Sequence, residues 1–291
     1  MKLTIVDVFA ERQFEGNQLA VIEDAAALST ATMQTIARET NFSETTFVIE
    51  RTGDEARVRI FTPEDELPFA GHPTLGTAWV LTGGQGAITL RLDAGPVTVS
   101  FAADGVGSFE PPPVTLNGAY PRALAAALVN LTVDDLHATA DPELTVVGPE
   151  FLLIPVASLD ALRAARVDEH AYRAQLAETP GIRSLFLFSE PGYTGKGGSP
   201  TGGDIAARMF FDTHGFREDP ATGSANSALA AYLSQRHGRT GRIVVDQGVE
   251  ILRPSRLYLE LGERLRVGGR VFESVRGELL VGDSTSMSSR T

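Results

Sequence analysis

Two stretches of the sequence decide the fold: His72-Pro73-Thr74-Leu75-Gly76-Thr77-Ala78 and Asp219-Pro220-Ala221-Thr222-Gly223-Ser224-Ala225. Matched letter by letter, they share Pro, Gly and Ala, and an apolar run typical of a buried helix follows each of them. A related strand-like segment precedes each stretch, Arg59-Ile60-Phe61-Thr62 in the first case and Arg208-Met209-Phe210-Phe211 in the second. Chance similarity of two helix starts is the simple alternative, but two separate blocks recur in the same order. We therefore predict two related lobes, each with a strand, a loop and a central helix.

Both stretches carry the residue types of a helix N-terminus. The first helical position tolerates proline, because the N–H group that proline lacks would be unpaired there. We therefore expect helices to begin at about Pro73 and Pro220, with Asp219 as an N-cap. The first turn of a helix leaves backbone N–H groups unpaired at the positive end of the helix dipole. Two such ends facing one cleft predict a site for a small carboxylate or phosphate. The residues expected to give close backbone approach and hydrogen-bond donors there are Gly71, Gly223 and Ser224.

Composition and charge exclude several classes of protein. The 291 residues are 43% hydrophobic and 21% charged, which is typical of a globular chain of about two domains. The net charge of −12 argues against nucleic acid and anionic membranes as partners. Cysteine is absent, which excludes disulfides, thiolate nucleophiles and two-thiol racemase chemistry. No apolar run approaches the roughly 20 residues of a membrane-spanning helix and no secretory signal is visible, so we expect a cytoplasmic protein.

The order of the predicted elements indicates an α+β fold. Turns at 52–54 and 93–95 join β-rich segments, which predicts antiparallel or mixed sheets. Pro111-Pro112-Pro113 stiffens a connection and places the lobes at residues 1–115 and 116–282, with the last segment free to return to the first lobe. Residues 283–291 are expected to form a frayed polar tail. The glycine-rich run Gly192–Gly203 lacks the spacing of a phosphate loop, and we expect a mobile hairpin tip there.

Three blocks of the sequence resemble the PhzF-like phenazine biosynthesis family: Asn41 to Phe47, Phe61 to Gly76 and Glu218 to Ala225. Gly16-Asn17 and Arg253-Pro254-Ser255 fit as well, so the resemblance spans almost the whole chain. It implies a diaminopimelate-epimerase-like fold, in which two pseudo-symmetric lobes each wrap a mostly antiparallel or mixed, barrel-like sheet around a central helix. The epimerases carry two cysteines at the paired helix starts, and the resemblance implies His72 and Asp219 in those places here. The departures from the family pattern are Gln18, Asp212, Leu252 and the Gly192–Gly203 loop, which resembles an extension.

Glu44 is the candidate proton carrier. It opens a strand between Phe42 and Phe47, and apolar surroundings raise the pKa of a carboxyl group, which can then take and return a proton near neutral pH. In PhzF-like enzymes the glutamate of this motif moves a proton between two carbons of dihydro-hydroxyanthranilate, so the resemblance implies that role for Glu44. From the residue alone, an exposed strand-edge glutamate or an ion pair is the open alternative.

His72 and Asp219 are the other catalytic candidates. His72 can relay a proton, donate a hydrogen bond to a substrate or only close a turn. Capping alone explains an aspartate before a proline, but the resemblance places Asp219 opposite His72. The remaining four histidines have no metal-ligand spacing, so we expect no metal. The sequence shows no cofactor motif either, so we expect no organic cofactor.

Two functional classes follow from these residues. The favoured one is a cofactor-independent isomerase that moves a proton between carbons of a small cyclic, dihydro-hydroxyanthranilate-like carboxylic acid. The alternative is a small-carboxylate-binding protein that retains the cleft, with no catalysis or with a different one. Glu44, His72 and Asp219 together favour the enzyme, because a binding module needs the helix ends but not the glutamate. The expected partners are a small anionic substrate and a second copy of the chain in a homodimer.

Overall fold

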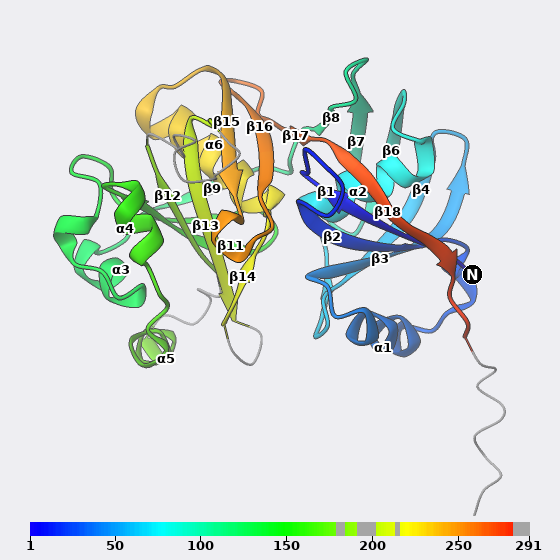
Figure 1. Ribbon diagram of the computed structural model, residues 1–291, viewed down its shortest axis with the longest axis horizontal. Coiled ribbons are helices and arrows are strands. Elements are labelled where there is room, and N and C mark those ends of the chain that lie inside the picture. The colour runs from blue at the N-terminus through cyan, green and yellow to red at the C-terminus, as the bar shows by residue number, and fades with distance from the viewer. Residues whose placement is uncertain (179–183, 191–201, 213–215, 282–291) are drawn as a thin grey trace, which may run out of the picture.

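The computed structural model describes residues 1–178, 184–190, 202–212 and 216–281, which form two lobes that lie side by side (Figure 1). The elements of the first half of the chain are β1 (Lys2–Val8), β2 (Asn17–Ile22), α1 (Thr30–Thr40), β3 (Glu44–Thr52), β4 (Glu55–Phe61), β5 (Glu66–Leu67), α2 (Gly71–Thr82), β6 (Ala87–Leu92), β7 (Gly95–Phe101) and β8 (Gly107–Phe109). Those that follow are β9 (Thr115–Ala119), α3 (Arg122–Leu128), β10 (Glu143–Val146), β11 (Glu150–Val156), α4 (Leu159–Ala164), α5 (Glu169–Glu178), β12 (Ser184–Ser189), β13 (Ile205–Asp212), β14 (Phe216–Asp219), α6 (Gly223–His237), β15 (Gly241–Gln247), β16 (Ser255–Leu261), β17 (Arg266–Gly269) and β18 (Val271–Glu278).

The two lobes repeat one strand order. In the first lobe β1 is antiparallel to β2, β2 is parallel to β3, and β4 pairs with β3, β5 and β6, of which only β6 runs parallel to it. In the second lobe β10 to β15 make the same pairs in the same directions. The hairpins β6–β7–β8 and β15–β16–β17 then complete each sheet. The predicted α+β fold of two pseudo-symmetric lobes with mixed sheets is therefore confirmed.

The chain crosses between the lobes after each repeat. Leaving β8, it adds β9 to the second lobe beside β10, and leaving β17, it adds β18 to the first lobe beside β1. Strands β8 and β17 pair with each other, which joins the two sheets. The last described strand thus lies in the same sheet as the first one.

Each sheet surrounds one helix. In α2 the residues Gly71–Ala78 are all buried, and in α6 the buried run is Gly223–Leu233. A helix that is buried on all sides cannot be amphipathic, and small residues allow the sheet to approach it closely. Glycines in the left-handed region, Gly83 and Gly238, end the two helices. Both central helices therefore have their N-terminal turns inside the molecule.

The helix starts correct the letter-by-letter match of the two stretches. The first helical residues are Gly71 and Gly223, so Pro220 lies outside α6 and Pro73 is the third residue of α2. Asp219 is the last residue of β14, where it pairs with Met209, and it is not the N-cap. Thr222 holds the N-cap position. Strand pairing keeps Asp219 extended, so the helix can only start further along the chain.

Strand register gives the true equivalence of the lobes. Thr45 pairs with Phe61 in the first lobe, as Leu185 pairs with Phe210 in the second. Ile60 pairs with Leu67, as Met209 pairs with Asp219, and each helix starts four residues after the second member of this pair. The equivalent positions are therefore Glu44 and Ser184, Leu67 and Asp219, Gly71 and Gly223, and His72 and Ser224. The resemblance implied that His72 and Asp219 occupy equivalent positions at the two helix starts. The strand register shows that this is wrong.

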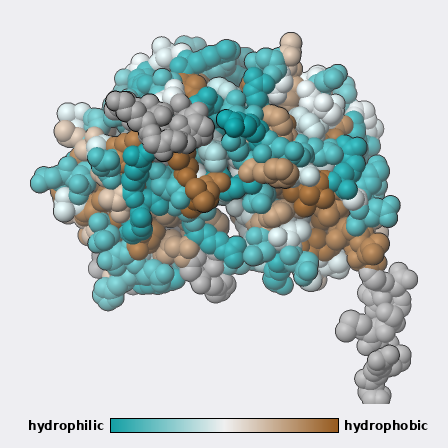
Figure 2. Space-filling model, viewed as in Figure 1, coloured by the Kyte–Doolittle hydropathy of each residue, from teal (hydrophilic) through white to brown (hydrophobic). Residues whose placement is uncertain are grey.

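The surface and the helices can be described only for the residues that the structure places. The face shown in Figure 2 is mostly hydrophilic, with apolar side chains in smaller patches between the hydrophilic ones. No helix within the described ranges is both long and apolar enough to cross a membrane. The frayed tail at 283–291 and the hairpin tip at Gly192–Gly203, apart from its last two residues, lie outside the residues described here.

Candidate functional site

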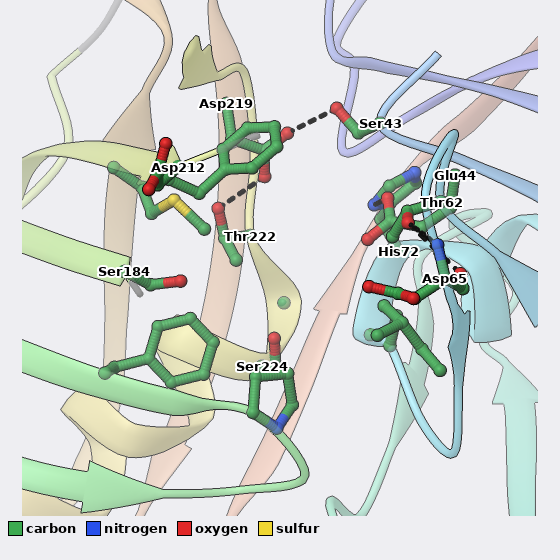
Figure 3. Close-up of a pocket in the computed structure, with 18 of the residues that line it drawn as sticks. Ser43, Glu44, Thr62, Asp65, His72, Ser184, Asp212, Asp219, Thr222 and Ser224 are labelled. Atoms are coloured by element: carbon green, nitrogen blue, oxygen red, sulfur yellow. Dashed lines mark hydrogen bonds and ion pairs between the residues drawn. The ribbon is translucent and has the colours of Figure 1, made fainter. Parts of the chain in front are cut away.

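The site lies where the two central helices begin. An open pocket of about 840 Å³, part of it open to solvent, lies between the lobes at the starts of α2 and α6 (Figure 3). Its lining includes every residue that the sequence proposed for the site, namely Glu44, His72, Asp219, Gly71, Gly223 and Ser224. The structure therefore brings together all six residues, although they come from distant parts of the chain.

The two helix starts touch each other through glycine. A Cβ atom on Gly71 would lie 2.7 Å from the Cα of Gly223, and one on Gly223 would lie 2.9 Å from the Cα of Gly71. Real Cβ atoms do not come this close to backbone, so only glycine permits the contact. The consequence is that two helix N-termini, each with unpaired N–H groups, meet at one end of the pocket.

Glu44 and His72 form the ionisable wall of the pocket in the first lobe. Glu44 Oε2 lies 3.4 Å from His72 Nδ1, and within the described ranges it has no hydrogen-bond partner. Burial, with a smaller contribution from the charge of Asp219, raises the pKa of Glu44 well above its ordinary value. The carboxyl group is thus suited to hold a proton near neutral pH, and the 15% of its side chain that stays exposed opens into the pocket.

His72 is a neutral histidine. Burial lowers its pKa to about 3, although the backbone of Gln18 opposes part of this shift. Its Nδ1 faces the amide nitrogen of Asn17 at 3.3 Å, and because this amide is a donor, we assign the ring proton to Nε2. Nδ1 then keeps a lone pair that can accept a hydrogen bond from a protonated Glu44, whose Oε2 lies 3.4 Å away.

Asp219 is held by side chains of both lobes. Its Oδ1 accepts hydrogen bonds from Asn17 Nδ2 and Ser43 Oγ, both at 2.8 Å, and its Oδ2 accepts one from Thr222 Oγ1 at 2.5 Å. Burial nevertheless raises the pKa of Asp219 to about 6, because it outweighs the three hydrogen bonds that favour the ionised form. Asp219 is therefore a fixed carboxylate that bridges the lobes beside the helix starts.

Comparison with known proteins gives the family. A family model described as phenazine biosynthesis-like protein matches residues 6–277. The chain belongs to this PhzF family. A trans-2,3-dihydro-3-hydroxyanthranilate isomerase of Pseudomonas fluorescens is 37% identical and covers 94% of this chain and 95% of its own. An uncharacterized isomerase of Mesorhizobium japonicum is 34% identical, with 95% and 98% covered. A solved structure titled as a predicted epimerase of Pseudomonas aeruginosa is 33% identical, has a TM-score of 0.79 and covers 97% of this chain and 99% of its own. The chain is thus an isomerase of the PhzF family.

Two residues that hold the loops of this PhzF-family site in place, Asn17 and Arg253, were not predicted as site residues from the sequence. Asn17 donates to Asp219 and to the carbonyl of Ala221 at 2.8 Å, so it ties the loop before α6 to the first lobe. Arg253 in turn holds the loop before Asn17, with a hydrogen bond to the Gly16 carbonyl at 2.9 Å. The family blocks Gly16-Asn17 and Arg253-Pro254-Ser255 already marked both positions. Only the fold shows that they serve Asp219, which lies about 200 residues from Asn17 in sequence.

The charge of the lining limits what this site can bind. Five carboxyl groups line the pocket, and no lysine or arginine side chain lines it within the described part of the chain. Asp212, a departure from the family pattern, is neutralised by an ion pair with Arg173 at 2.7 Å. The helix starts are therefore the positive end of the pocket, and an anion would bind there. Among the described residues, no cluster of three or more His, Cys, Asp or Glu side chains could hold a metal ion.

Proposed function

We propose that this PhzF-family isomerase moves a proton between two carbons of a small cyclic carboxylic acid of the dihydro-hydroxyanthranilate kind, with Glu44 as the proton carrier. The observation that carries the proposal is the state of Glu44. A buried carboxyl with a raised pKa and an unpartnered oxygen, next to a neutral imidazole, is suited to take a proton from carbon and return it. The names of the relatives support the substrate class.

The substrate carboxylate would bind at the helix starts. The contact between Gly71 and Gly223 brings the first-turn N–H groups of α2 and α6 to the same place. This position fixes the ring between the two lobes, with one face toward Glu44. Negative charge that develops on the carboxylate side of the ring is stabilised by the same N–H groups.

In the reaction, the Glu44 carboxylate accepts a proton from one ring carbon, and the electron pair of the broken C–H bond delocalises toward the bound carboxylate. The protonated Glu44 then delivers the proton to a second carbon, so that atoms and charge balance and the carboxylate is regenerated. The raised pKa of Glu44 reduces the pKa difference between this carboxyl group and the far less acidic C–H group of the substrate. The smaller difference lowers the barrier of the first proton transfer.

His72 and Asp219 would prepare Glu44 for this task. The His72 ring stays neutral because its pKa lies at about 3, and with the ring proton assigned to Nε2 its Nδ1 can orient the protonated carboxyl without competing for the proton. Asp219 raises the pKa of Glu44 through its charge, and Asn17, Ser43 and Thr222 keep that charge in place. No step of this sequence requires a cofactor.

Deuterium exchange tests the proposal. Trans-2,3-dihydro-3-hydroxyanthranilate is incubated with the enzyme in deuterated buffer, and the product is followed by NMR and mass spectrometry. We expect conversion to an isomer of equal mass, apart from deuterium that enters at the receiving carbon to the extent that protonated Glu44 exchanges with the solvent before it delivers its proton. A set of cyclic amino and hydroxy acids serves as a second substrate panel. Tight binding without conversion or exchange of any of them would instead support a carboxylate-binding protein.

A further inference from the structure

Ser184, which opens β12 in the second lobe, lines the pocket and has no task in the proposed function. Resting on that function, we propose that Ser184 is a specificity-determining residue, whose hydroxyl binds a neutral hydroxyl substituent on the ring of the substrate. Its place in the fold supports this. The strand register makes it the counterpart of Glu44, on the opposite wall of the same pocket.

The hydroxyl of Ser184 is directed into the pocket and has no hydrogen-bond partner among the described residues. Figure 3 shows it on the second-lobe side, across from Glu44 and His72. The residue is 7% exposed, and its Oγ makes no hydrogen bond to any part of the chain that the structure describes. Water can satisfy this hydroxyl in an empty pocket, but a bound ring displaces that water. A ligand must then offer a hydrogen-bonding group at this position or leave the hydroxyl unpaired, which is costly.

The neighbours of Ser184 favour a neutral group over a charged one. Phe151, Met209 and Phe211 line the pocket on the same side, and Ser184 is the direct strand partner of Phe211. An ammonium group would lose hydration against these apolar side chains, and it would be drawn to the carboxylates elsewhere in the lining. A hydroxyl loses less, and it can both donate to and accept from a serine.

The same strand provides a matched control. Ser189 ends β12 as Ser184 begins it, and its buried Oγ also lacks a hydrogen-bond partner among the described residues. It does not line the pocket. Replacing either serine by alanine removes an unpartnered hydroxyl, so neither Ser184→Ala nor Ser189→Ala should unfold the protein.

Binding of three flat ring acids that cannot undergo the proton shift tests the proposal by calorimetry. Anthranilate lacks only the hydroxyl of 3-hydroxyanthranilate, and 3-hydroxybenzoate lacks only the amino group. We expect the unsubstituted protein to bind 3-hydroxyanthranilate about tenfold more tightly than anthranilate, the effect of roughly one hydrogen bond. Ser184→Ala should reduce this ratio to below about threefold and leave the preference over 3-hydroxybenzoate unchanged. Ser189→Ala should change neither ratio.

The other outcomes overturn the inference in distinguishable ways. If all three acids bind and Ser184→Ala keeps the hydroxyl preference, Ser184 does not set specificity, while the proposed function stands. If Ser184→Ala removes the amino preference instead, the substituent is wrongly assigned. If Ser189→Ala has the same effect as Ser184→Ala, the cause is a change in β12 and not a contact in the pocket. If none of the acids binds even to the unsubstituted protein, both this inference and the proposed substrate class are wrong.

Discussion

The two lobes have one architecture but different chemistry at equivalent positions. The first lobe places Glu44 and His72 in the pocket, and the second places Ser184 and Ser224 at the matching points. At these matched positions the first lobe can therefore carry a proton, while the second lobe can only form hydrogen bonds. Inversion at a carbon needs proton carriers on both faces, whereas a shift along one face of a ring needs one. The asymmetry thus favours a single-carrier proton shift.

Asp219 is the exception on the second lobe, and its surroundings explain why. Its counterpart in the first lobe is the apolar Leu67. Two of its three side-chain hydrogen bonds come from Asn17 and Ser43 of the first lobe. Asp219 therefore acts with the ionisable wall. The positions equivalent to Glu44 and His72 in the second lobe carry only the hydroxyl groups of Ser184 and Ser224, which form the hydroxyl wall.

The largest expected effect is the loss of the proton carrier. Glu44→Gln keeps the shape of the side chain but cannot move a proton, so we expect kcat to fall by about three orders of magnitude. The affinity for a carboxylate inhibitor should change less than about threefold, because the helix starts remain. Steady-state kinetics and calorimetry measure the two quantities separately.

Glu50→Gln provides the control, since Glu50 lies on the same strand and is exposed. It should leave kcat unchanged. Near-normal turnover by Glu44→Gln would remove the functional difference between the lobes and refute the assignment of Glu44.

The next effect concerns the pH dependence of stability. The pKa of Asp219 rises from 3.8 to about 6 in the folded protein, so the folded state binds this proton more tightly than the unfolded state. The free energy of unfolding therefore gains a contribution as the pH falls below about 6 toward 4, and loses it as the pH rises again. Asp219→Asn removes this dependence, which is on the order of 3 kcal/mol.

Urea denaturation at about pH 7.5 and about pH 4.5 measures this pH dependence of the unfolding free energy. Relative to the unsubstituted protein, Asp219→Asn should have a higher unfolding free energy at about pH 7.5 than at about pH 4.5, because the unsubstituted protein buries a charged carboxylate at the higher pH. Asp54→Asn, at an exposed turn, should give no such change. If the unfolding free energies of Asp219→Asn and the unsubstituted protein change with pH in parallel, the pKa of Asp219 is not raised in the folded protein.

Much of the fold could be predicted from the sequence, because local signals carry it. The turns at 52–54 and 93–95 join antiparallel strands, β3 to β4 and β6 to β7, as expected. The register of the repeat could not be predicted. Pro, Gly and Ala are common at helix starts, so the letters match best five residues away from the structural equivalence. The strand pairs that fix Asp219 opposite Met209 depend on tertiary contacts.

The site shows the same division. The six residues at motif positions were predicted, because carboxyl groups, histidine and glycine at helix starts have recognisable chemistry. Ser184 was not, since a serine at the start of a strand carries no signal until the register sets it opposite Glu44. Long-range pairs such as Asn17 with Asp219 are equally invisible in a single sequence.

A smaller effect is expected at the junction of the lobes. Gly223→Ala places a Cβ 2.9 Å from Gly71 Cα, so the helix starts must move apart, at a cost of about 2 kcal/mol in unfolding free energy. The same movement should weaken carboxylate binding. Gly277→Ala is the control, because no atom of the described residues lies within 4 Å of the added methyl group there. If Gly223→Ala is as stable as Gly277→Ala, the two lobes do not depend on this contact.

The smallest expected effect separates binding from catalysis on the hydroxyl wall. Ser224 is buried beside the start of α6, and its hydroxyl points into the pocket (Figure 3). Ser224→Ala removes one donor near the substrate carboxylate, so we expect affinity to fall about fivefold, roughly 1 kcal/mol, with kcat nearly unchanged. Ser227→Ala is matched to it, since Ser227 lies on the same helix but donates to the Gly223 carbonyl and does not line the pocket. It should affect stability and not affinity. A large loss of kcat in Ser224→Ala would mean that the second lobe takes part in proton transfer, and the contrast between an ionisable wall and a hydroxyl wall would then be wrong.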